Sequence, residues 1–430
     1  MKYIKYNSYK DSEISWIGEI PTTWECWKVS HGFSLIGSGT TPDTEDSEYY
    51  DGDIPWVTTS ELRENIVFNT KKKVTQKAVL ELSALKKYKP NTLLIAMYGA
   101  TIGRLGILGT EATVNQACCA FDKPKAFDSK FVFYWFYIAK PILISLSSGG
   151  GQPNLNQDTL KRIKIPVPSI SEQQSIVDFL DKEVSRIDTL IAKKQQFIER
   201  LKEKRLAVIS NAVSKGINPN AELKSSGVEW LGDIPKIWDV KKLKYLVNQI
   251  NQKVEHDEDL PLPYIGLENI VPWKGELVTQ EISYVPEGVS NTFYEGCVLF
   301  GKLRPYLAKA CITTKKGLCS SEILVLEPLK EIVPEFLLNC LLSDGFIKDV
   351  DSSTFGSKMP RASWDYIGNI KMPVLSKSEQ IKIVDQINQE TSKIDILTSK
   401  AEAAINKLQE YKTALISAAV TGKIIVTDQV

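Results

Sequence analysis

The sequence from Ser171 to Gly216 reads SEQQSIVDFLDKEVSRIDTLIAKKQQFIERLKEKRLAVISNAVSKG. Its apolar residues recur at alternating intervals of four and three, which is the 3.5-residue period of a coiled-coil seam. The seam consists of Leu180, Val184, Ile187, Ile191, Lys194, Ile198, Leu201, Arg205, Val208 and Ala212. Ser171 is a suitable N-cap, Glu172 suits the first turn, and Gly216 is a suitable end. The pattern predicts one long helix over residues 169–216.

The same pattern returns 207 residues further along the chain, from Ser378 onward. The second seam consists of Ile387, Thr391, Ile394, Thr398, Ala401, Ile405, Leu408, Lys412, Leu415 and Ala419. It predicts a second helix over residues 376–422, closed by Gly422. Arg205 and Lys412 occupy the same point of the two seams. Because a charge is costly at a core position, we expect each to specify the register or to reach past the seam to water.

Each helix of about 44 residues is roughly 65 Å long, and its apolar stripe needs a partner. We expect the helices to bury each other as an antiparallel coiled coil, because the intervening domain must return the chain to the start of the second helix. This pairing would place the two globular domains at opposite ends. An alternative is that each stripe belongs to an ordinary amphipathic helix lying on its own domain. Ten consecutive seam positions in two places favour the coiled coil.

The segments outside the helices also resemble each other. Trp16-Ile17-Gly18-Glu19-Ile20-Pro21 with Trp24 returns as Trp230-Leu231-Gly232-Asp233-Ile234-Pro235 with Trp238. An offset of 214 residues is far longer than a solenoid period. We predict an α+β protein with pseudo-twofold symmetry. It has two similar mixed α/β domains over residues 1–168 and 217–375, joined by the two long helices, and a tail over residues 423–430.

The composition is that of an ordinary globular protein. The 430 residues are 43% hydrophobic and 24% charged with a net charge of +1, so any nucleic-acid affinity must come from local patches. Seven cysteines without a C-x-x-C pair predict reduced, buried thiols in a cytosolic protein. The N-terminus lacks the apolar core of a signal peptide, and the run from Phe131 to Leu146 is too short to span a bilayer. We expect a buried helix there, and a cytoplasmic protein without a membrane.

The internal alignment continues more weakly inside the two domains. Residues 93–104 align with 298–309, and Asn115-Gln116 with Ser320-Ser321. Because the framework is shared while the polar residues differ, two copies could read two different sequences. The polar candidates of the first domain are Thr40, Thr41, Thr58, Thr59, Ser60, Lys71, Lys72, Lys73, Tyr98, Arg104, Asn115, Gln116, Gln152 and Asn154. Those of the second are Glu268, Asn269, Lys302, Arg304, Tyr306, Lys309, Ser320, Ser321, Lys358 and Arg361.

Basic clusters occur in both copies. Residues 71–89 hold seven lysines against the single acid Glu81, and residues 302–316 hold five basic residues and no acid. Phosphate neutralisation needs such patches, and Arg, Asn and Gln can pair bidentately with base edges. A lysine run can equally be a solvated face. The stretch Ser147–Gln152 lacks the P-loop pattern and is either a flexible loop that approaches DNA or a plain linker.

Catalytic motifs are missing from the sequence. His31 and His256 lie in different domains and make a poor catalytic pair and a poor metal site. We find no P-loop and no Rossmann fingerprint. Residues 260–264, LPLPY, resemble the Asn/Asp-Pro-Pro-Tyr/Phe motif of amino-methyltransferases only superficially, since the amide or carboxylate and the adjacent prolines are absent. The acidic runs at 45–46 and 257–259 are expected to be solvated loops. We expect no catalytic residue and no metal site.

The chain resembles the DNA specificity subunit of type I restriction-modification enzymes, over nearly its whole length. The resemblance is carried by the two tryptophan-containing openings, by the helix starts and by the helix ends. The starts are Pro166-Val167-Pro168-Ser169 and Pro373-Val374-Leu375-Ser376, each followed by Ser-Glu-Gln. The ends are Ala212-Val213-Ser214-Lys215-Gly216 and Ala419-Val420-Thr421-Gly422-Lys423, in which the final Gly and Lys are swapped.

The resemblance implies that each globular domain is a target recognition domain that reads one half of a bipartite site on double-stranded DNA. The helices would set the separation of the halves and dock two methyltransferase subunits, and restriction/motor subunits would join them. The chain itself would be non-catalytic and bind no cofactor, since S-adenosylmethionine, ATP and Mg²⁺ would belong to the partners. Two alternatives remain: a coiled-coil scaffold with two protein-binding heads, and a self-contained enzyme with an unrecognised site.

Overall fold

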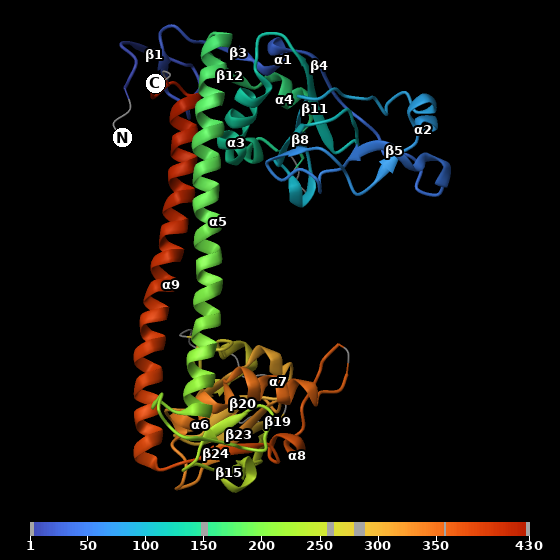
Figure 1. Ribbon diagram of the computed structural model, residues 1–430. Helices are drawn as coiled ribbons and strands as arrows, with labels where there is room; N and C mark the ends of the chain where they lie inside the picture. Colours follow the sequence, from blue (N-terminus) through green and yellow to red (C-terminus); the bar gives the residue numbers. More distant parts are fainter. Residues whose placement is uncertain (1–3, 148–153, 256–261, 279–288, 357, 427–430) are drawn as a thin grey trace. The chain divides into compact units, whose positions relative to one another are not determined.

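The computed structural model describes residues 4–147, 154–255, 262–278, 289–356 and 358–426. The chain forms two compact units. Unit 1 comprises Met1–Lys193 and Ala404–Val430, and unit 2 comprises Lys194–Ala403. Each unit therefore contains one globular domain together with one half of each long helix, α5 (Ile170–Lys215) and α9 (Lys377–Val420) (Figure 1).

Unit 1 is built on a five-stranded sheet in the order β4-β11-β8-β9-β6. Its strands are β1 (Tyr9–Asp11), β2 (Glu19–Pro21), β3 (Glu25–Lys28), β4 (Phe33–Ser38), β5 (Tyr50–Val57), β6 (Asn65–Val67), β7 (Lys73–Val74), β8 (Leu93–Ala96), β9 (Leu105–Leu108), β10 (Thr113–Val114), β11 (Cys118–Pro124) and β12 (Lys164–Val167). Its shorter helices are α1 (Val29–Gly32), α2 (Gln76–Glu81), α3 (Ser129–Ser145) and α4 (Gln157–Arg162).

Helix α3 lies between the sheet and α5 (Figure 1). The sequence predicted a buried helix at this apolar run, and the prediction is confirmed. Asp128 caps its first turn by accepting hydrogen bonds from the amides of Lys130 and Phe131. Tyr134 of α3 donates to Asp181 of α5 at 2.7 Å, and Trp135 and Phe136 are almost completely buried. The helix thus joins the sheet to the long helix through one apolar core.

Unit 2 repeats this arrangement with a four-stranded sheet in the order β16-β23-β20-β21. Its strands are β13 (Leu223–Ser225), β14 (Asp233–Pro235), β15 (Asp239–Lys242), β16 (Val247–Ile250), β17 (Lys253–Glu255), β18 (Tyr264–Ile265), β19 (Val289–Phe293), β20 (Val298–Gly301), β21 (Ala310–Ile312), β22 (Gly317–Cys319), β23 (Ile323–Pro328) and β24 (Lys371–Val374). Its helices are α6 (Pro334–Leu341), α7 (Asp344–Ser352) and α8 (Trp364–Ile367).

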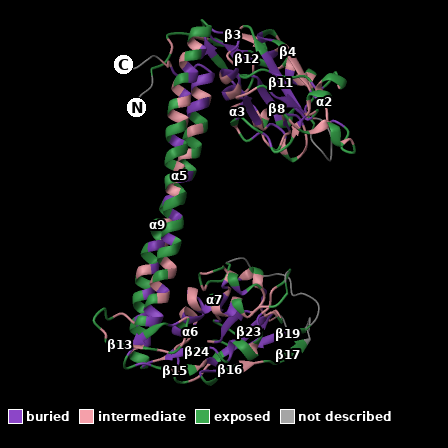
Figure 2. Ribbon diagram, turned by 45° about the vertical axis from the view of Figure 1, so that its right-hand side comes forward, coloured by how far each residue is buried: buried purple, intermediate pink, exposed green. Residues whose placement is uncertain are grey.

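The two globular domains share one topology. The order β4-β11-β8-β9 corresponds to β16-β23-β20-β21, and the parallel pair β5/β10 corresponds to β18/β22. One difference is that unit 2 has two short helices, α6 and α7, where unit 1 has the continuous α3. In both domains the buried residues gather on the central strands, shown in purple in Figure 2. The predicted fold class of two similar mixed domains with long helices is confirmed by this topology.

The start of each long helix is fixed by the repeated Ser-Glu-Gln motif. Glu172 accepts a hydrogen bond from the indole of Trp24 at 3.1 Å, and Glu379 accepts one from Trp238 at 3.0 Å. The tryptophan of each opening motif is therefore held by the glutamate of the helix start in the same unit. The expectation that Ser171 is the N-cap is wrong, because the helix begins at Ile170 and the hydroxyl of Ser169 accepts from the Glu172 amide at 3.3 Å.

The two long helices pair in antiparallel directions inside each unit. In unit 1 the start of α5 packs on the end of α9, as in the shared cluster of Ile176 and Leu180 with Leu415 and Ala419. In unit 2 the end of α5 packs on the start of α9. Every seam position predicted from the heptad pattern is buried or half-buried (Figure 2). The coiled-coil interpretation is therefore confirmed over the alternative of helices that lie separately on their own domains.

The basic seam residues neither point to open water nor stay unpaired. Lys412 donates to both carboxylate oxygens of Asp188 at 2.8 Å. Arg205 lies 3.6 Å from Asp395 and donates to the carbonyl of Trp273 at 2.8 Å. Of the two roles expected for these side chains, the contacts fit the first, specifying the register, and not the second, reaching water, because each side chain finds a carboxylate on the opposite helix. Sequence pattern alone could not show those acids, since they lie outside the seam.

In unit 1 the segment that follows α9 lies beside the N-terminal segment of the described chain. Gly422 follows α9 with a φ of +71°, and a Cβ placed there would lie 2.3 Å from Pro21 of the opening motif. The amide of Ile425 donates to the carbonyl of Ile4 at 2.7 Å. In unit 2 the equivalent Gly216, at φ +70°, lies against Trp238. The opening motif of each domain is thus the docking surface for the end of a long helix. No helix among the described residues is long and apolar enough to cross a membrane.

Candidate nucleic-acid interface

Several strands of unit 1 meet at one edge, where their connecting loops carry polar side chains. The register pairs Cys119 with Ser38, Cys118 with Ala96, and Val114 with Val57. The ends of β4, β5, β8 and β10 therefore lie together with the start of β11. The loops that leave this edge contain many of the polar residues singled out in the sequence.

A small set of hydrogen bonds holds these loops in unit 1. The Asn115 amide donates to Val57 O at 2.9 Å, and the Thr58 amide donates to the Glu61 carboxylate at 3.0 Å. The Met97 amide donates to Ala117 O, and the Leu155 amide to Met97 O. The carboxylate of Glu61 and the backbone carbonyls thus fix loops that are far apart in the sequence.

Unit 2 contains the same bonds at the equivalent positions. The Ser320 amide donates to Ile265 O at 3.1 Å, and the Gly266 amide donates to the Asn269 side chain at 2.7 Å. The Lys302 amide donates to Glu322 O, and the Ala362 amide to Lys302 O. The two domains therefore share a backbone frame, which is the set of loops joined by these hydrogen bonds. It comprises residues 57–61, 97, 115–117 and 154–155 in unit 1 and residues 265–269, 302, 320–322 and 361–362 in unit 2.

The side chains on this common frame differ. Asn115 and Gln116 stand where unit 2 has Ser320 and Ser321, and Ala117 stands where it has Glu322. The isolated bridges Tyr98↔Asn154 and Leu303↔Arg361 pair the next loop with its neighbour in each copy. Asn154 is exposed and Arg361 is half-buried. A constant backbone with variable polar side chains is the arrangement that lets one scaffold recognise two different ligands.

The structure brings several candidates of the first domain together. Thr41 donates to the side-chain oxygen of Gln116 at 2.5 Å, and Tyr98 pairs with Asn154. Thr58 and Ser60 are held by Glu61, which accepts from both hydroxyls. Burial raises the pKa of Tyr98, so its hydroxyl keeps its proton at neutral pH. The same loops carry Thr40 and Thr59, both half-buried.

Other candidates of the first domain lie apart from this edge. Lys71, Lys72 and Lys73 lie at β7, which pairs with the middle of β5. Arg104, in contrast, lies beside this edge: it is half-buried in the turn before β9, and its carbonyl accepts from the amide of Ala96 at the end of β8. Gln152 lies outside the described residues, as do most of the glycine stretch, His256 and the acidic run at 257–259.

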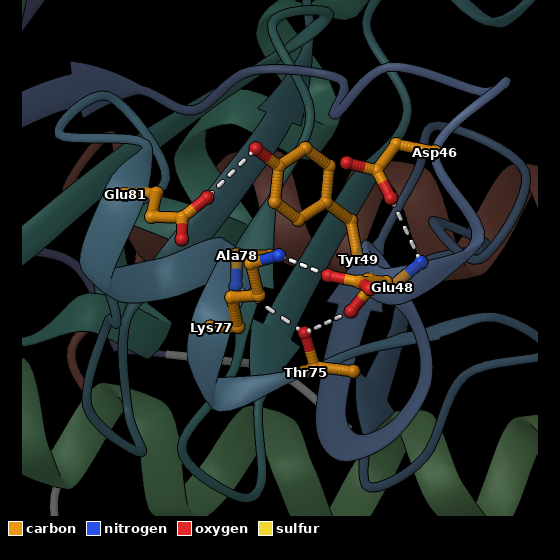
Figure 3. Close-up of polar contacts among 7 residues, drawn as sticks. All are labelled: Asp46, Glu48, Tyr49, Thr75, Lys77, Ala78 and Glu81. Carbon is orange, nitrogen blue, oxygen red and sulfur yellow. Dashed lines mark hydrogen bonds and ion pairs between the residues drawn. The ribbon is translucent and has the colours of Figure 1, made fainter.

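The lysine cluster at residues 71–89 carries less free charge than its sequence suggests. Lys77 forms an ion pair with Glu48 and lies 5.8 Å from the ring centroid of Tyr49, whose hydroxyl donates to Glu81 at 2.9 Å (Figure 3). Lys87 lies 3.5 Å from Glu111. The acids come from segments outside the cluster, so a count along the sequence overstates its positive charge. Lys71, Lys72, Lys86 and Lys89 remain exposed.

In the second domain the candidates divide in the same way. Ser320, Ser321, Asn269 and Arg361 lie on the shared frame, next to the exposed Arg304, which has a left-handed φ of +51°. The ammonium of Lys309 donates to Leu267 O at 2.6 Å, so this residue helps to hold the frame. The remaining polar candidates are the half-buried Lys302 and the exposed Glu268, Tyr306 and Lys358.

Two acidic residues of the frame were missed in the sequence, Glu61 and Glu322. Glu61 holds the loop after β5, and Glu322 forms an ion pair with Arg361 at 3.0 Å. Glu322 could have been found, because the offset that aligns Asn115 with Ser320 also aligns Ala117 with Glu322. Among the residues that the structure describes, no three His, Cys, Asp or Glu side chains gather as a metal site requires.

Comparisons with known proteins agree with this architecture. A model of the type I restriction modification DNA specificity domain matches residues 21–200. The chain is 24% identical to the type I restriction enzyme MjaVIII specificity subunit of Methanocaldococcus jannaschii, covering 99% of this chain and 97% of that protein.

Two solved structures share the fold. One, from a study of complex assembly and conformational transition in the type I R-M system, has a TM-score of 0.71 at 14% identity, covering 94% of this chain and 99% of its own. The HsdS subunit from Thermoanaerobacter tengcongensis has a TM-score of 0.54 at 14% identity, covering 94% and 98%. Residues 21–200 thus match the type I restriction modification DNA specificity domain, and the chain is similar over nearly its full length to type I restriction enzyme specificity subunits.

Proposed function

We propose that this chain is the DNA sequence-recognition subunit of a type I restriction-modification complex. Each globular domain reads one half of a bipartite, asymmetric target on double-stranded DNA. The observation that carries this proposal is the pair of equivalent frames: the same backbone hydrogen bonds recur at Asn115 and Ser320, while the exposed side chains around them differ. Two identical frames with different side chains fit a target whose halves have different sequences.

The long helices supply the spacer in this proposal. A helix of 46 residues such as α5 is roughly 70 Å long, which is the scale of about twenty base pairs of B-DNA. Rigid connection of two modest binding sites raises affinity only when the connector matches the distance between the half-sites. The spacer length of the target would then depend on helix length, and the half-site sequences on the globular domains.

The chain acts without catalytic residues of its own. Two methyltransferase subunits dock on the helices and modify adenine, and restriction/motor subunits join to give the nuclease. S-adenosylmethionine, ATP and Mg²⁺ belong to these partners. Support for the partners comes from the similarity to type I restriction enzyme specificity subunits and from helices that keep exposed apolar residues such as Leu190, Phe197 and Leu397.

The test is co-expression with the modification subunits in a host without adenine methylation, followed by methylome sequencing. We expect methylated adenines in one bipartite motif, and none when this chain is omitted. Methylation of a continuous motif, or methylation that persists without this chain, would contradict the proposal.

Binding of the purified complex to duplex DNA should weaken steeply with salt, because Lys and Arg release counterions from phosphates. A scaffold with protein-binding heads would show no such dependence on duplex DNA.

A further inference from the structure

We propose that Arg361 reads a guanine in the half-site of the second domain and that Glu322 positions it for this task. The inference rests on the proposed function and names a base contact within it. The Nε of Arg361 donates to the Glu322 carboxylate at 3.0 Å, and the Arg361 side chain remains 43% exposed. One edge of the guanidinium is therefore fixed while the other faces solvent.

The two terminal NH₂ groups of Arg361 can donate hydrogen bonds to the two acceptor atoms of a guanine base. Among the described residues, none accepts a hydrogen bond from the two terminal NH₂ groups of Arg361, which leaves a fork of parallel donors. In the major groove, guanine presents two neighbouring acceptors, O6 and N7, and a bidentate arginine is their commonest specific partner. Because the carboxylate already holds Nε, less side-chain freedom is lost when the fork binds.

The backbone around Arg361 and Glu322 is fixed on both sides. Arg361 and Phe355 exchange backbone hydrogen bonds at 3.3 and 3.4 Å, and Arg361 forms a bridge with Leu303. Glu322 accepts from the Lys302 amide at 2.9 Å and donates its own amide to the Ser320 hydroxyl at 3.2 Å. Both residues of the ion pair are therefore held by backbone hydrogen bonds of the shared frame.

The first domain places a different base-reading side chain at the same point. Asn154 occupies the position of Arg361, since Tyr98↔Asn154 and Leu303↔Arg361 are equivalent bridges. Ala117 occupies the position of Glu322, so the negative group is present only in the copy that has the arginine to pair with it. This correlation between the two copies favours a positioning role for Glu322, because an uncompensated carboxylate would repel DNA phosphates.

The test uses the full chain in complex with its modification subunits and reads the methylome of each variant. Arg361→Ala and Arg361→Lys should both weaken the requirement for a G·C pair at one position of one half-site. The preference for G·C over other base pairs at that position should fall about ten- to a hundredfold. The lysine variant keeps the positive charge beside Glu322, so it separates loss of the fork from loss of the ion pair. The other half-site should stay unchanged in both variants.

Glu322 is tested as a positioning residue by a conservative rescue. Glu322→Ala should weaken the preference for G·C at the same position. Glu322→Gln keeps an oxygen acceptor for Nε of Arg361 and should therefore retain most of that preference. The matched control is Lys241→Ala, which removes a 2.7 Å ion pair with Glu331 elsewhere in unit 2 and should leave the motif unchanged.

The inference is overturned if Arg361→Lys reads the motif as well as the wild type, or if Arg361→Ala lowers methylation of all sites equally, as loss of a phosphate contact would. Relaxation at an A·T pair would overturn it as well. These outcomes differ from failure of the proposed function, in which the wild-type complex itself would show no bipartite motif.

Discussion

Lys412 on α9 donates hydrogen bonds to both carboxylate oxygens of Asp188 on α5, each at 2.8 Å. The two residues lie 224 positions apart in the chain, and their ion pair occupies the seam of the antiparallel helices in unit 1. Arg205 and Asp395 form the equivalent pair in unit 2. The repeated seam charge is therefore a cross-helix contact that fixes which residues of the two helices face each other.

Removing one partner of this ion pair should weaken the helix contact. Lys412→Met keeps the apolar stem and should lower the free energy of unfolding by about 1 kcal/mol. Adding Asp188→Asn should cost little more, so a double-mutant cycle should give a coupling energy of similar size. A matched control is the exposed pair Lys202–Glu199 on one helix, whose coupling should be about 0.3 kcal/mol. Additive effects of Lys412→Met and Asp188→Asn would contradict the assignment.

Gln173 should be far more sensitive to substitution than its neighbour Gln174. The Gln173 side chain is fully buried and satisfies three backbone groups, donating to Pro168 O and Ala126 O and accepting from the Asp128 amide. Gln173→Ala leaves these groups unpaired and should destabilise the protein by about 2–4 kcal/mol. Gln174 is exposed, so Gln174→Ala should change stability by less than about 0.5 kcal/mol. Equal melting temperatures for the two variants would rule this interpretation out.

The glycines after the two helices should respond differently to alanine. Gly422 and Gly216 both have φ near +70°, which costs a residue with a side chain about 1 kcal/mol. A Cβ at Gly422 would also lie 2.3 Å from Cδ of Pro21, whereas at Gly216 the nearest atom, of Trp238, is at 3.1 Å. We expect Gly422→Ala to lower the thermal midpoint more than Gly216→Ala. The reverse order would show that the helix end is not docked on the opening motif in this way.

Thiol reactivity should be confined to one cysteine. Burial raises the pKa of Cys119, Cys311 and Cys319 to about 12, and it raises the pKa of Cys118 and Cys340 further. Burial also raises the pKa of Cys297, which is buried like these five. Thiol reagents attack the thiolate, so these groups should stay nearly unreactive from pH 7 to pH 9 in the folded chain.

Cys26 is half-buried and should account for the fast phase of labelling. Cys26→Ser should remove that phase, and a denaturant should expose all seven thiols, with rates that rise as pH approaches their ordinary pKa. Rapid labelling of several thiols under native conditions would contradict the buried positions.

Much of the architecture could be predicted from the sequence, because it is encoded in local periodicity and in repetition. The heptad pattern from Leu180 to Ala212 predicts the first long helix, and its repeat predicts the second long helix as the partner. The acids that neutralise Arg205 and Lys412 could not be predicted, because they lie off the seam and meet the cations only in the antiparallel arrangement. The N-cap was placed two residues late for a similar reason, since two serines, Ser169 and Ser171, precede the same Glu-Gln.

The candidate interface was less accessible from the sequence. Asn115, Gln116 and Tyr98 could be chosen by residue type, and they do lie together at one sheet edge. The lysine cluster looked more basic than it is, because Glu48 and Glu111 fold back onto it. Glu322 was not among the predicted site residues, although its alignment with Ala117 shows that the two copies differ in charge at this position. Residue type selects candidates, but their neighbours are set by strand register.

In the proposed function, the length of the two helices sets the spacer between the two half-sites. The most direct test inserts one heptad into each helix, between Lys193 and Lys194 and between Asn406 and Lys407, so that the seam phase is kept. The insertion lengthens the helices by about 10 Å, or about three base pairs. Methylome sequencing should then show a spacer about three base pairs longer with both half-site sequences unchanged. An unchanged spacer together with altered half-sites would contradict the account.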